Sequence, residues 1–150
     1  MINLPEKAII EIRAGNVKEA KRILGIPFSV KGKVIHGNHL GRTIGFPTAN
    51  IQPDEDTLVL PGNGVYAVNV FVNGKSLQGM TNIGIRPTLD LLQLSIEVNI
   101  FDFNEDIYGQ SISVEFFDRI RDERKFPGLD ALKEQISKDK ETALSLLGVR

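Results

Sequence analysis

The stretch GVYAVNVFVNGKSLQGMT, residues 64–81, decides the class of fold. Gly64–Val72 and Lys75–Thr81 both have the composition of β-strands. Asn73-Gly74 stands between them and is a strong signal for a tight hairpin, because both residues accept the positive φ that such turns require. The stretch therefore predicts two antiparallel strands joined by a short turn.

Three further runs with strand composition surround this hairpin, namely Val30–Ile35, Leu94–Phe101 and Ile112–Phe117. Helical signals occur only near the two ends of the chain. Strands in succession with helices at both ends favour a mainly β fold, a small antiparallel barrel with helical attachments.

Two short helices are predicted before the first strand. Pro5 suits the first turn of a helix, and Gly15 is a natural stop for it. Asn16 is expected to cap the second helix, with Glu19 as the partner in a capping box. Gly25 ends this second helix.

A longer helix is predicted from Leu129 towards the carboxyl end. Its predicted apolar face consists of residues at helical spacing, namely Leu129, Leu132, Ile136, Ala143 and Leu147. Gly148 follows this pattern and is expected to end the helix.

The composition is that of one soluble domain. The 150 residues suffice to bury a core, and the 41% hydrophobic and 25% charged fractions lie near globular averages. A formal net charge of −1 argues against nucleic-acid or acidic-membrane partners. The lack of cysteine excludes disulfides, thiolate zinc sites and cysteine nucleophiles. Because neither a membrane-length apolar run nor a signal-peptide core occurs, we expect a cytoplasmic protein.

The motif GRTIGFPTAN, residues 41–50, is the strongest candidate for chemistry. Its glycines let the backbone approach a ligand closely. If the chain is extended after Pro47, the side chains of Thr48 and Asn50 point to the same face. A hydroxyl and an amide oxygen are neutral ligands that suit Mg²⁺ carrying phosphate oxygens. The motif lacks the Gly-Lys-Ser/Thr ending of a P-loop, and the alternative is an ordinary loop that leads into a strand.

Glu97 is the candidate general base. Its neighbours Ile96 and Val98 belong to the apolar face of the predicted strand, whereas Glu97 belongs to the polar face. A carboxylate on a rigid strand can take the proton of a substrate hydroxyl, although a solvated outer face is the commoner reason for such a residue. The segment Phe101–Gly109 is predicted to be an acidic turn, whose phenylalanines pack either in the core or beside a planar ligand.

Two polar segments and a histidine pair allow more than one interpretation. The glycine- and proline-containing segment Asn82–Thr88 is either a flap that closes over a phosphate or a plain connecting loop. The mixed charges of Arg121–Phe126 form either a solvated turn or a phosphate-recognition element with two arginines. His36 and His39 have no third ligand in view, which favours turn or core roles over a metal site.

Four blocks of these residues occur in one order along the chain. They are His36-Gly37 with Gly41-Arg42 and Gly45–Asn50; Asn82–Gly84 with Arg86–Thr88; Glu97 with Asp106–Gly109; and Arg121, Glu123, Lys125 and Phe126. Together they resemble the flavokinase family, the riboflavin kinase domain that also ends bacterial bifunctional FAD synthetases. The resemblance extends from about Leu24 to the carboxyl end, and Gly-Phe-Pro-Thr-Ala-Asn is its most specific part.

This resemblance implies a six-stranded antiparallel Greek-key barrel that transfers the γ-phosphate of ATP to the 5′-hydroxyl of riboflavin, giving FMN and ADP. Position by position, Glu97 matches the catalytic base, and Thr48 and Asn50 match the Mg²⁺ ligands. The ATP-contacting positions are Gly37, Arg42, Thr48, Ile100, Asp102 and Tyr108. The positions that contact the flavin are Arg121, Arg124 and Phe126. The Asn82–Thr88 segment matches a flap over the substrates.

The sequence departs from the family pattern at two places. Asn99 stands where many relatives have histidine, so any help from that imidazole is absent. The segment between Thr88 and Glu97 is also short, so the sequence does not fix how far a flap would reach.

We expect a linker-like helical segment at residues 1–24 and a riboflavin kinase barrel with its C-terminal helix at residues 25–150. No His-x-Gly-His motif of an adenylyltransferase domain occurs. The chain is therefore interpreted as either a monofunctional kinase or a module excised from a fusion with such a domain, and no FAD synthesis is expected from it alone. The competing hypotheses are a non-catalytic flavin- or nucleotide-binding module and a barrel that serves only in interactions.

Overall fold

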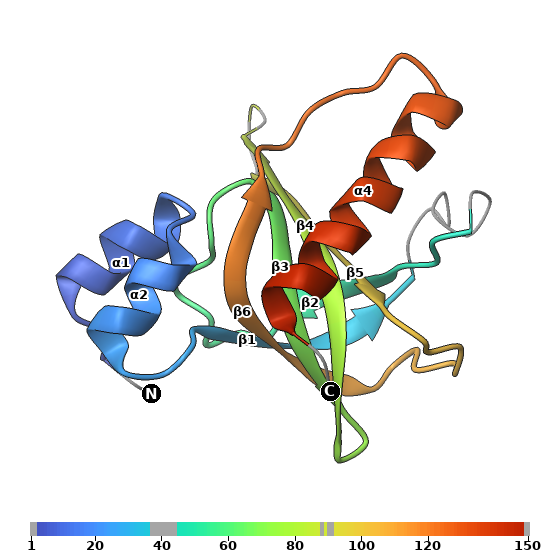
Figure 1. The fold of residues 1–150 in the computed structure, drawn as a ribbon. Coiled ribbons are helices and arrows are strands. Elements are labelled where there is room, and N and C mark those ends of the chain that lie inside the picture. Colours follow the sequence, from blue (N-terminus) through green and yellow to red (C-terminus); the bar gives the residue numbers. More distant parts are fainter. Residues whose placement is uncertain (1–2, 37–44, 88, 90–91, 149–150) are drawn as a thin grey trace.

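The computed structural model describes residues 3–36, 45–87, 89 and 92–148, and its centre is a closed antiparallel barrel (Figure 1). Its strands are β1 (Ser29–Ile35), β2 (Ala49–Pro53), β3 (Gly64–Val72), β4 (Lys75–Pro87), β5 (Leu92–Ile100) and β6 (Ser111–Arg121). They follow one another around the barrel in the order β1-β2-β5-β4-β3-β6, and β6 closes it by pairing with β1.

Four of the strands form a Greek key. β3, β4 and β5 pair in succession, and β6 returns to pair with the other edge of β3. The resulting order, β6-β3-β4-β5, is that of the motif. The prediction of a six-stranded Greek-key barrel is confirmed.

The β3–β4 hairpin turns at Asn73 and Gly74, whose φ angles are 51° and 76°. Val72 and Lys75 are the last paired residues before this turn. A two-residue turn with positive φ at both positions matches the right-handed twist of the strands beside it, so the hairpin prediction is also confirmed.

β4 and β6 are longer than the sequence indicates. β4 pairs with β5 without interruption up to Pro87, so the prediction of a loop from Asn82 to Pro87 is wrong, while the role of a flap over the substrates stays a prediction. Cross-strand hydrogen bonds to β5 outweigh the local preference of glycine for a turn, and Pro87, which has no N–H to donate, occurs at the strand end. Thr88 lies outside the described residues. β6 continues past Phe117, so Arg121 is the end of a strand and not part of a turn.

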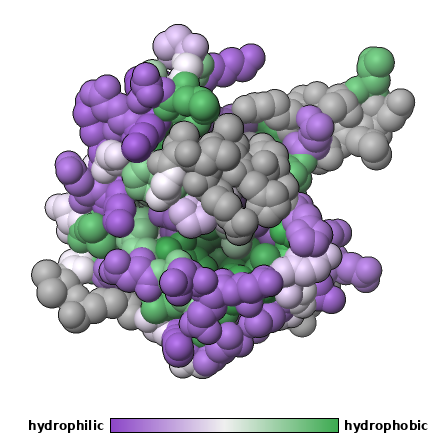
Figure 2. All heavy atoms as spheres, turned by 90° about the vertical axis from the view of Figure 1, so that its right-hand side faces the viewer, coloured by the Kyte–Doolittle hydropathy of each residue, from purple (hydrophilic) through white to green (hydrophobic). Residues whose placement is uncertain are grey.

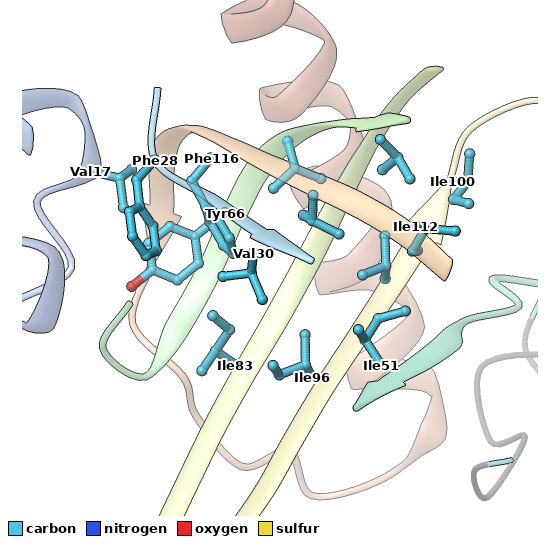
Figure 3. Close-up of a cluster of buried hydrophobic side chains, with 14 of the residues drawn as sticks. Val17, Phe28, Val30, Ile51, Tyr66, Ile83, Ile96, Ile100, Ile112 and Phe116 are labelled. Atoms are coloured by element: carbon cyan, nitrogen blue, oxygen red, sulfur yellow. The ribbon is translucent and has the colours of Figure 1, made fainter. Parts of the chain in front are cut away.

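The barrel interior is filled by branched aliphatic and aromatic side chains from every strand (Figure 3). Tyr66 and Phe116 meet edge to face, with ring centroids 5.3 Å apart. Ile96, Val98 and Ile100 of β5 are buried, as the alternation of the sequence predicts. Because these side chains are tightly packed, the backbone of β5 has a fixed position, and so do the Cα atoms of its outward-facing residues.

Helices α1 (Glu6–Arg13) and α2 (Val17–Leu24) form where the sequence predicts them. The predicted capping box is wrong. The side chain of Asn16 makes no capping hydrogen bond and donates instead to Glu11 Oε2 at 2.9 Å, while Glu19 accepts from Arg22. Apolar residues of these helices, including Ile12 and Val17, belong to the same buried cluster as the barrel strands. The division between residues 24 and 25 stays a prediction.

Helix α4 (Leu129–Leu147) packs against β3, β4 and β6 on the outside of the barrel (Figure 1). Ala143 is buried there, with Ile136 and Leu147 packed around it. Leu129 departs from the predicted apolar face, since it is 51% exposed at the first position of the helix. Among the described residues, no helix combines the length and the apolar character needed to cross a membrane.

Candidate active site

Glu97 lies in a row of polar residues that crosses three strands. Its partners in the ladder are Asn50 on β2 and Asn82 on β4. Residues directly opposite one another on antiparallel strands share a face of the sheet. Because Ile96 and Val98 on either side of Glu97 are buried in the core, this row belongs to the outer face of the barrel.

A pocket forms over this outer face, where the end of β6, the residues after it and α4 cover the barrel. We name it the Glu97 pocket. It brings together predicted site residues from distant parts of the chain, namely Thr48, Glu97, Arg121, Arg124 and Phe126. The guanidinium carbons of Arg124 and Arg121 lie 4.8 Å and 5.6 Å from the centre of the Phe126 ring. This arginine–phenylalanine cluster provides flat, cationic surfaces at the pocket wall.

A second pocket lies beside the first, between β2 and the connection from β5 to β6. We name it the Tyr108 pocket. Four predicted site residues line it, namely Thr48, Asn50, Ile100 and Tyr108. The rings of Tyr108 and His36 stack with centroids 3.7 Å apart and an interplanar angle of 17°. Figure 2 shows this side of the molecule, with hydrophobic residues in a hollow near its centre and hydrophilic ones below and beside them.

Thr48 lines both pockets and so marks the place where they meet. The chain just before it is fastened to β5, because Asn99 Nδ2 donates a hydrogen bond of 2.7 Å to the Pro47 carbonyl oxygen. Asn99 is buried at this contact. Two ligands, one in each pocket, can therefore meet at Thr48, close to the strand that carries Glu97.

The environment of Glu97 favours the protonated carboxyl. Burial raises the pKa of Glu97 above the ordinary value of a glutamate, and the nearby negative charge of Glu123 raises this pKa further. Glu123 also lines the Glu97 pocket and approaches β4 closely, since a Cβ on Gly84 would lie 2.8 Å from its Oε2 atom. A raised pKa in a pocket is typical of a group that exchanges protons in catalysis.

Thr48 and Asn50 are the residues that could hold a metal. Both line the Tyr108 pocket, and both offer neutral oxygen ligands. Over the described parts of the chain, no three His, Cys, Asp or Glu side chains are grouped as a metal site. Such a donor set fits Mg²⁺ that arrives with phosphate oxygens, which supply the negative charge and most of the coordination.

Not every predicted residue is placed in these pockets. Asp102 is exposed in the turn after β5, has a φ of 54°, and lines neither pocket. Gly37, Arg42 and His39 lie outside the described residues. The solvated-turn interpretation of Arg121–Phe126 is wrong for Arg121, whose side chain is only 19% exposed.

Sequence reasoning did not single out Asp139, gave Glu123 no role of its own, and did not foresee that Asn99 anchors the chain before Thr48. Asp139 of α4 lines the Glu97 pocket and is 2% exposed. A signal for it was present, since Asp139 stands three residues after Ile136 and four before Ala143, on the apolar face of the helix. The partner of Asn99 could not be found this way, because Pro47 is distant in the sequence.

The fold and the two pockets define a class of protein, namely a small closed β-barrel with two adjoining pockets, one of which holds the carboxylate of Glu97. Residues 24–147 match the model of the flavokinase family, described as riboflavin kinase. The chain belongs to this family.

The relatives of the chain agree with this assignment. It is 49% identical to the bifunctional riboflavin kinase/FMN adenylyltransferase of Bacillus subtilis, over 89% of this chain and 43% of that protein. A crystal structure described as a macrolide-efflux protein from Streptococcus pneumoniae has a TM-score of 0.89 and 42% identity, over 94% of this chain and 46% of the other. The riboflavin kinase of Trypanosoma brucei has a TM-score of 0.56 and 29% identity, over 81% and 80% of the two chains. The chain thus spans less than half of the bifunctional relative.

Proposed function

We propose that this chain is a riboflavin kinase, which transfers the γ-phosphate of ATP to the 5′-hydroxyl of riboflavin and releases FMN and ADP. The observation that carries the proposal is the position of Thr48, which lines both pockets beside the strand of Glu97. Phosphoryl transfer requires a donor and an acceptor to be aligned, and it needs little covalent help from the protein.

Each of the two pockets binds one of the two substrates in this proposal. ATP occupies the Tyr108 pocket, where Ile100 and Tyr108 contact it and Thr48 lies near its phosphates. Asp102, which lines neither pocket, and Gly37 and Arg42 stay predicted ATP contacts on the resemblance alone. The flavin occupies the Glu97 pocket, and its ring lies against Arg121, Arg124 and Phe126.

Glu97 acts as the general base. It accepts the proton of the riboflavin 5′-hydroxyl as the oxygen of that group bonds to the γ-phosphorus. The bond from this phosphorus to the bridging oxygen of ATP breaks, and ADP leaves. Thr48 and Asn50 are the proposed ligands of Mg²⁺, which would neutralise charge on the transferred phosphate.

The proposal is tested by incubating the protein with riboflavin, ATP and Mg²⁺ and separating the flavins by chromatography. We expect FMN and ADP in equal amounts, and no FMN when the metal is chelated. Riboflavin binding without turnover would contradict the kinase proposal and favour the alternative, a non-catalytic flavin-binding module. If neither binding nor turnover occurred, the barrel would serve only in interactions.

We further expect that a protein consisting of these 150 residues stops at FMN. Making FAD requires a second site that activates the α-phosphate of ATP, usually on a separate domain of roughly 100 residues or more. The described residues are instead taken up by one barrel and the helices packed on it. The measurement supplies FMN, ATP and Mg²⁺ and assays FAD and pyrophosphate. Formation of both products would show that the barrel has a second activity.

The pH dependence of the reaction gives a test of Glu123. A base must be deprotonated, so kcat/KM should fall on the acid side, with a midpoint above the ordinary pKa of glutamate because the pKa of Glu97 is raised. Glu123→Gln removes the negative charge of Glu123, the smaller of the two causes of the raised pKa of Glu97. The midpoint should therefore move to lower pH, while burial of Glu97 keeps it above the ordinary pKa of a glutamate. The control is Glu55→Gln, an exposed residue that lines neither pocket. An unchanged midpoint in Glu123→Gln would show that its charge does not act on Glu97.

A further inference from the structure

A buried carboxylate on α4 is connected to both arginines of the Glu97 pocket. Asp139 accepts hydrogen bonds from Arg121 Nε at 2.9 Å and 3.0 Å, one to each carboxylate oxygen, and from Arg121 Nη2 at 2.8 Å. Asp139 itself is 2% exposed. An ion pair this deeply buried gains little net stability, since both charges lose their water, but it fixes the geometry of the two groups closely.

The connection to the second arginine passes through Gln135, one helical turn before Asp139. Gln135 Nε2 donates to Asp139 Oδ1 at 2.9 Å, and Gln135 Oε1 accepts from Arg124 Nη2 at 2.9 Å. The carboxylate can only accept, so it orients the amide of Gln135 with the oxygen towards Arg124. Gln135 does not line the pocket and reaches it only through these partners.

The two arginines differ in how many of their guanidinium donors are already used in hydrogen bonds to the protein. Arg121 uses Nε and Nη2 for Asp139, and its Nη1 donates to the Asp122 carbonyl oxygen at 3.0 Å. All three guanidinium nitrogens of Arg121 therefore donate to protein atoms, so Arg121 can contact a planar ligand mainly through the flat face of its guanidinium. Arg124 is exposed, and its Nη2 bond to Gln135 is the only hydrogen bond it makes among the described residues.

We propose that Asp139, directly for Arg121 and through Gln135 for Arg124, is the positioning residue that holds both arginines against Phe126 for the ring of the acceptor. Helix α4 is then part of the acceptor site and not only a cover for the barrel. This inference rests on the proposed function, because the acceptor is taken to be riboflavin in the Glu97 pocket.

The test measures riboflavin and ATP kinetics for Asp139→Asn, together with direct riboflavin binding followed by flavin fluorescence. Asparagine keeps the size of the side chain and removes its charge. Losing one partner of a buried, hydrogen-bonded charge pair should raise both KM and Kd for riboflavin by roughly tenfold or more. The KM for ATP and kcat at saturating riboflavin should stay within about twofold, since these report the other pocket and the chemical step.

Two further variants make the test specific. Glu141→Gln removes an exposed carboxylate from the same helix and should leave all constants unchanged. Gln135→Leu releases Arg124 alone, so it should raise the riboflavin KM by a smaller factor, about threefold. In the Asp139→Asn background it should add little, because residues that act through one network are not additive. If Asp139→Asn does not fold, the riboflavin KM of Gln135→Leu decides the question.

The possible results distinguish a failure of the positioning role of Asp139 from a failure of the proposed riboflavin kinase activity. An active parent with a riboflavin KM that does not change in either variant would overturn the positioning role and leave the kinase proposal intact. Equal increases in the KM for both substrates would also overturn it, since that result indicates general loosening of the fold. A parent that neither binds nor phosphorylates riboflavin would overturn the proposed function and this inference with it.

Discussion

Glu97→Gln is expected to lower kcat by about 10²–10⁴-fold, the usual contribution of a general base. Glutamine keeps the size of the side chain and its position on β5, so riboflavin binding should largely survive. The measurement is steady-state kinetics at saturating substrates, with riboflavin binding measured separately. Activity within about threefold of the parent would remove Glu97 from the role of base.

The same variant should be more stable than the parent at neutral pH. The pKa of Glu97 is raised in the folded protein, first by burial and then by Glu123. The folded state therefore binds the proton more tightly than the unfolded state, and stability declines as pH rises from the ordinary pKa towards the raised one. Glutamine is neutral and avoids this loss. Thermal unfolding should show a higher Tm for Glu97→Gln at pH 7, and a difference that shrinks below the ordinary pKa.

A gain in stability with a loss of turnover is the combination that distinguishes a catalytic carboxylate from a structural one. Destabilisation by Glu97→Gln at neutral pH would mean that the carboxylate makes a favourable contact in the folded state, and its raised pKa would then need another cause.

The second large effect is expected from Thr48→Val combined with Asn50→Leu. The double variant removes both proposed Mg²⁺ ligands and replaces them with side chains of similar size. FMN formation should fall by at least about 10²-fold, because neutralising the transferred phosphate contributes several kcal/mol to phosphoryl transfer. Riboflavin binding should persist, since most of the Glu97 pocket is left in place.

The controls concern the fold and the metal. Thr142→Val changes an exposed threonine of α4 and should have no effect on either quantity. The Tm of the double variant should lie close to that of the parent, because neither residue belongs to the buried core. A folded double variant that makes FMN at the parental rate and at ordinary Mg²⁺ concentrations would show that the metal assignment is wrong.

Local signals were sufficient for most of the architecture. The Asn-Gly turn, the alternation around Glu97 and the helical spacing after Leu129 each depend on residues close together in the chain, and each is confirmed. The fold prediction failed where long-range pairing overrode local preference. The segment Asn82–Pro87 contains glycine and proline, yet it forms strand because β5 lies beside it.

For the site, the sequence by itself determined which residue types are present and their order, and hence the resemblance that suggested Thr48, Glu97 and Arg121. Only the tertiary structure decided how these residues are combined. It joins the two pockets at Thr48, fastens the chain before Thr48 to Asn99, and sets Glu123 near Glu97. It also shows that Asp139, which the sequence presents only as a charged helix residue, is the buried hydrogen-bond partner of Arg121. The physical reason is that burial, pKa and hydrogen-bond partners depend on atoms close in space, and barrel closure brings together residues that are far apart in the chain.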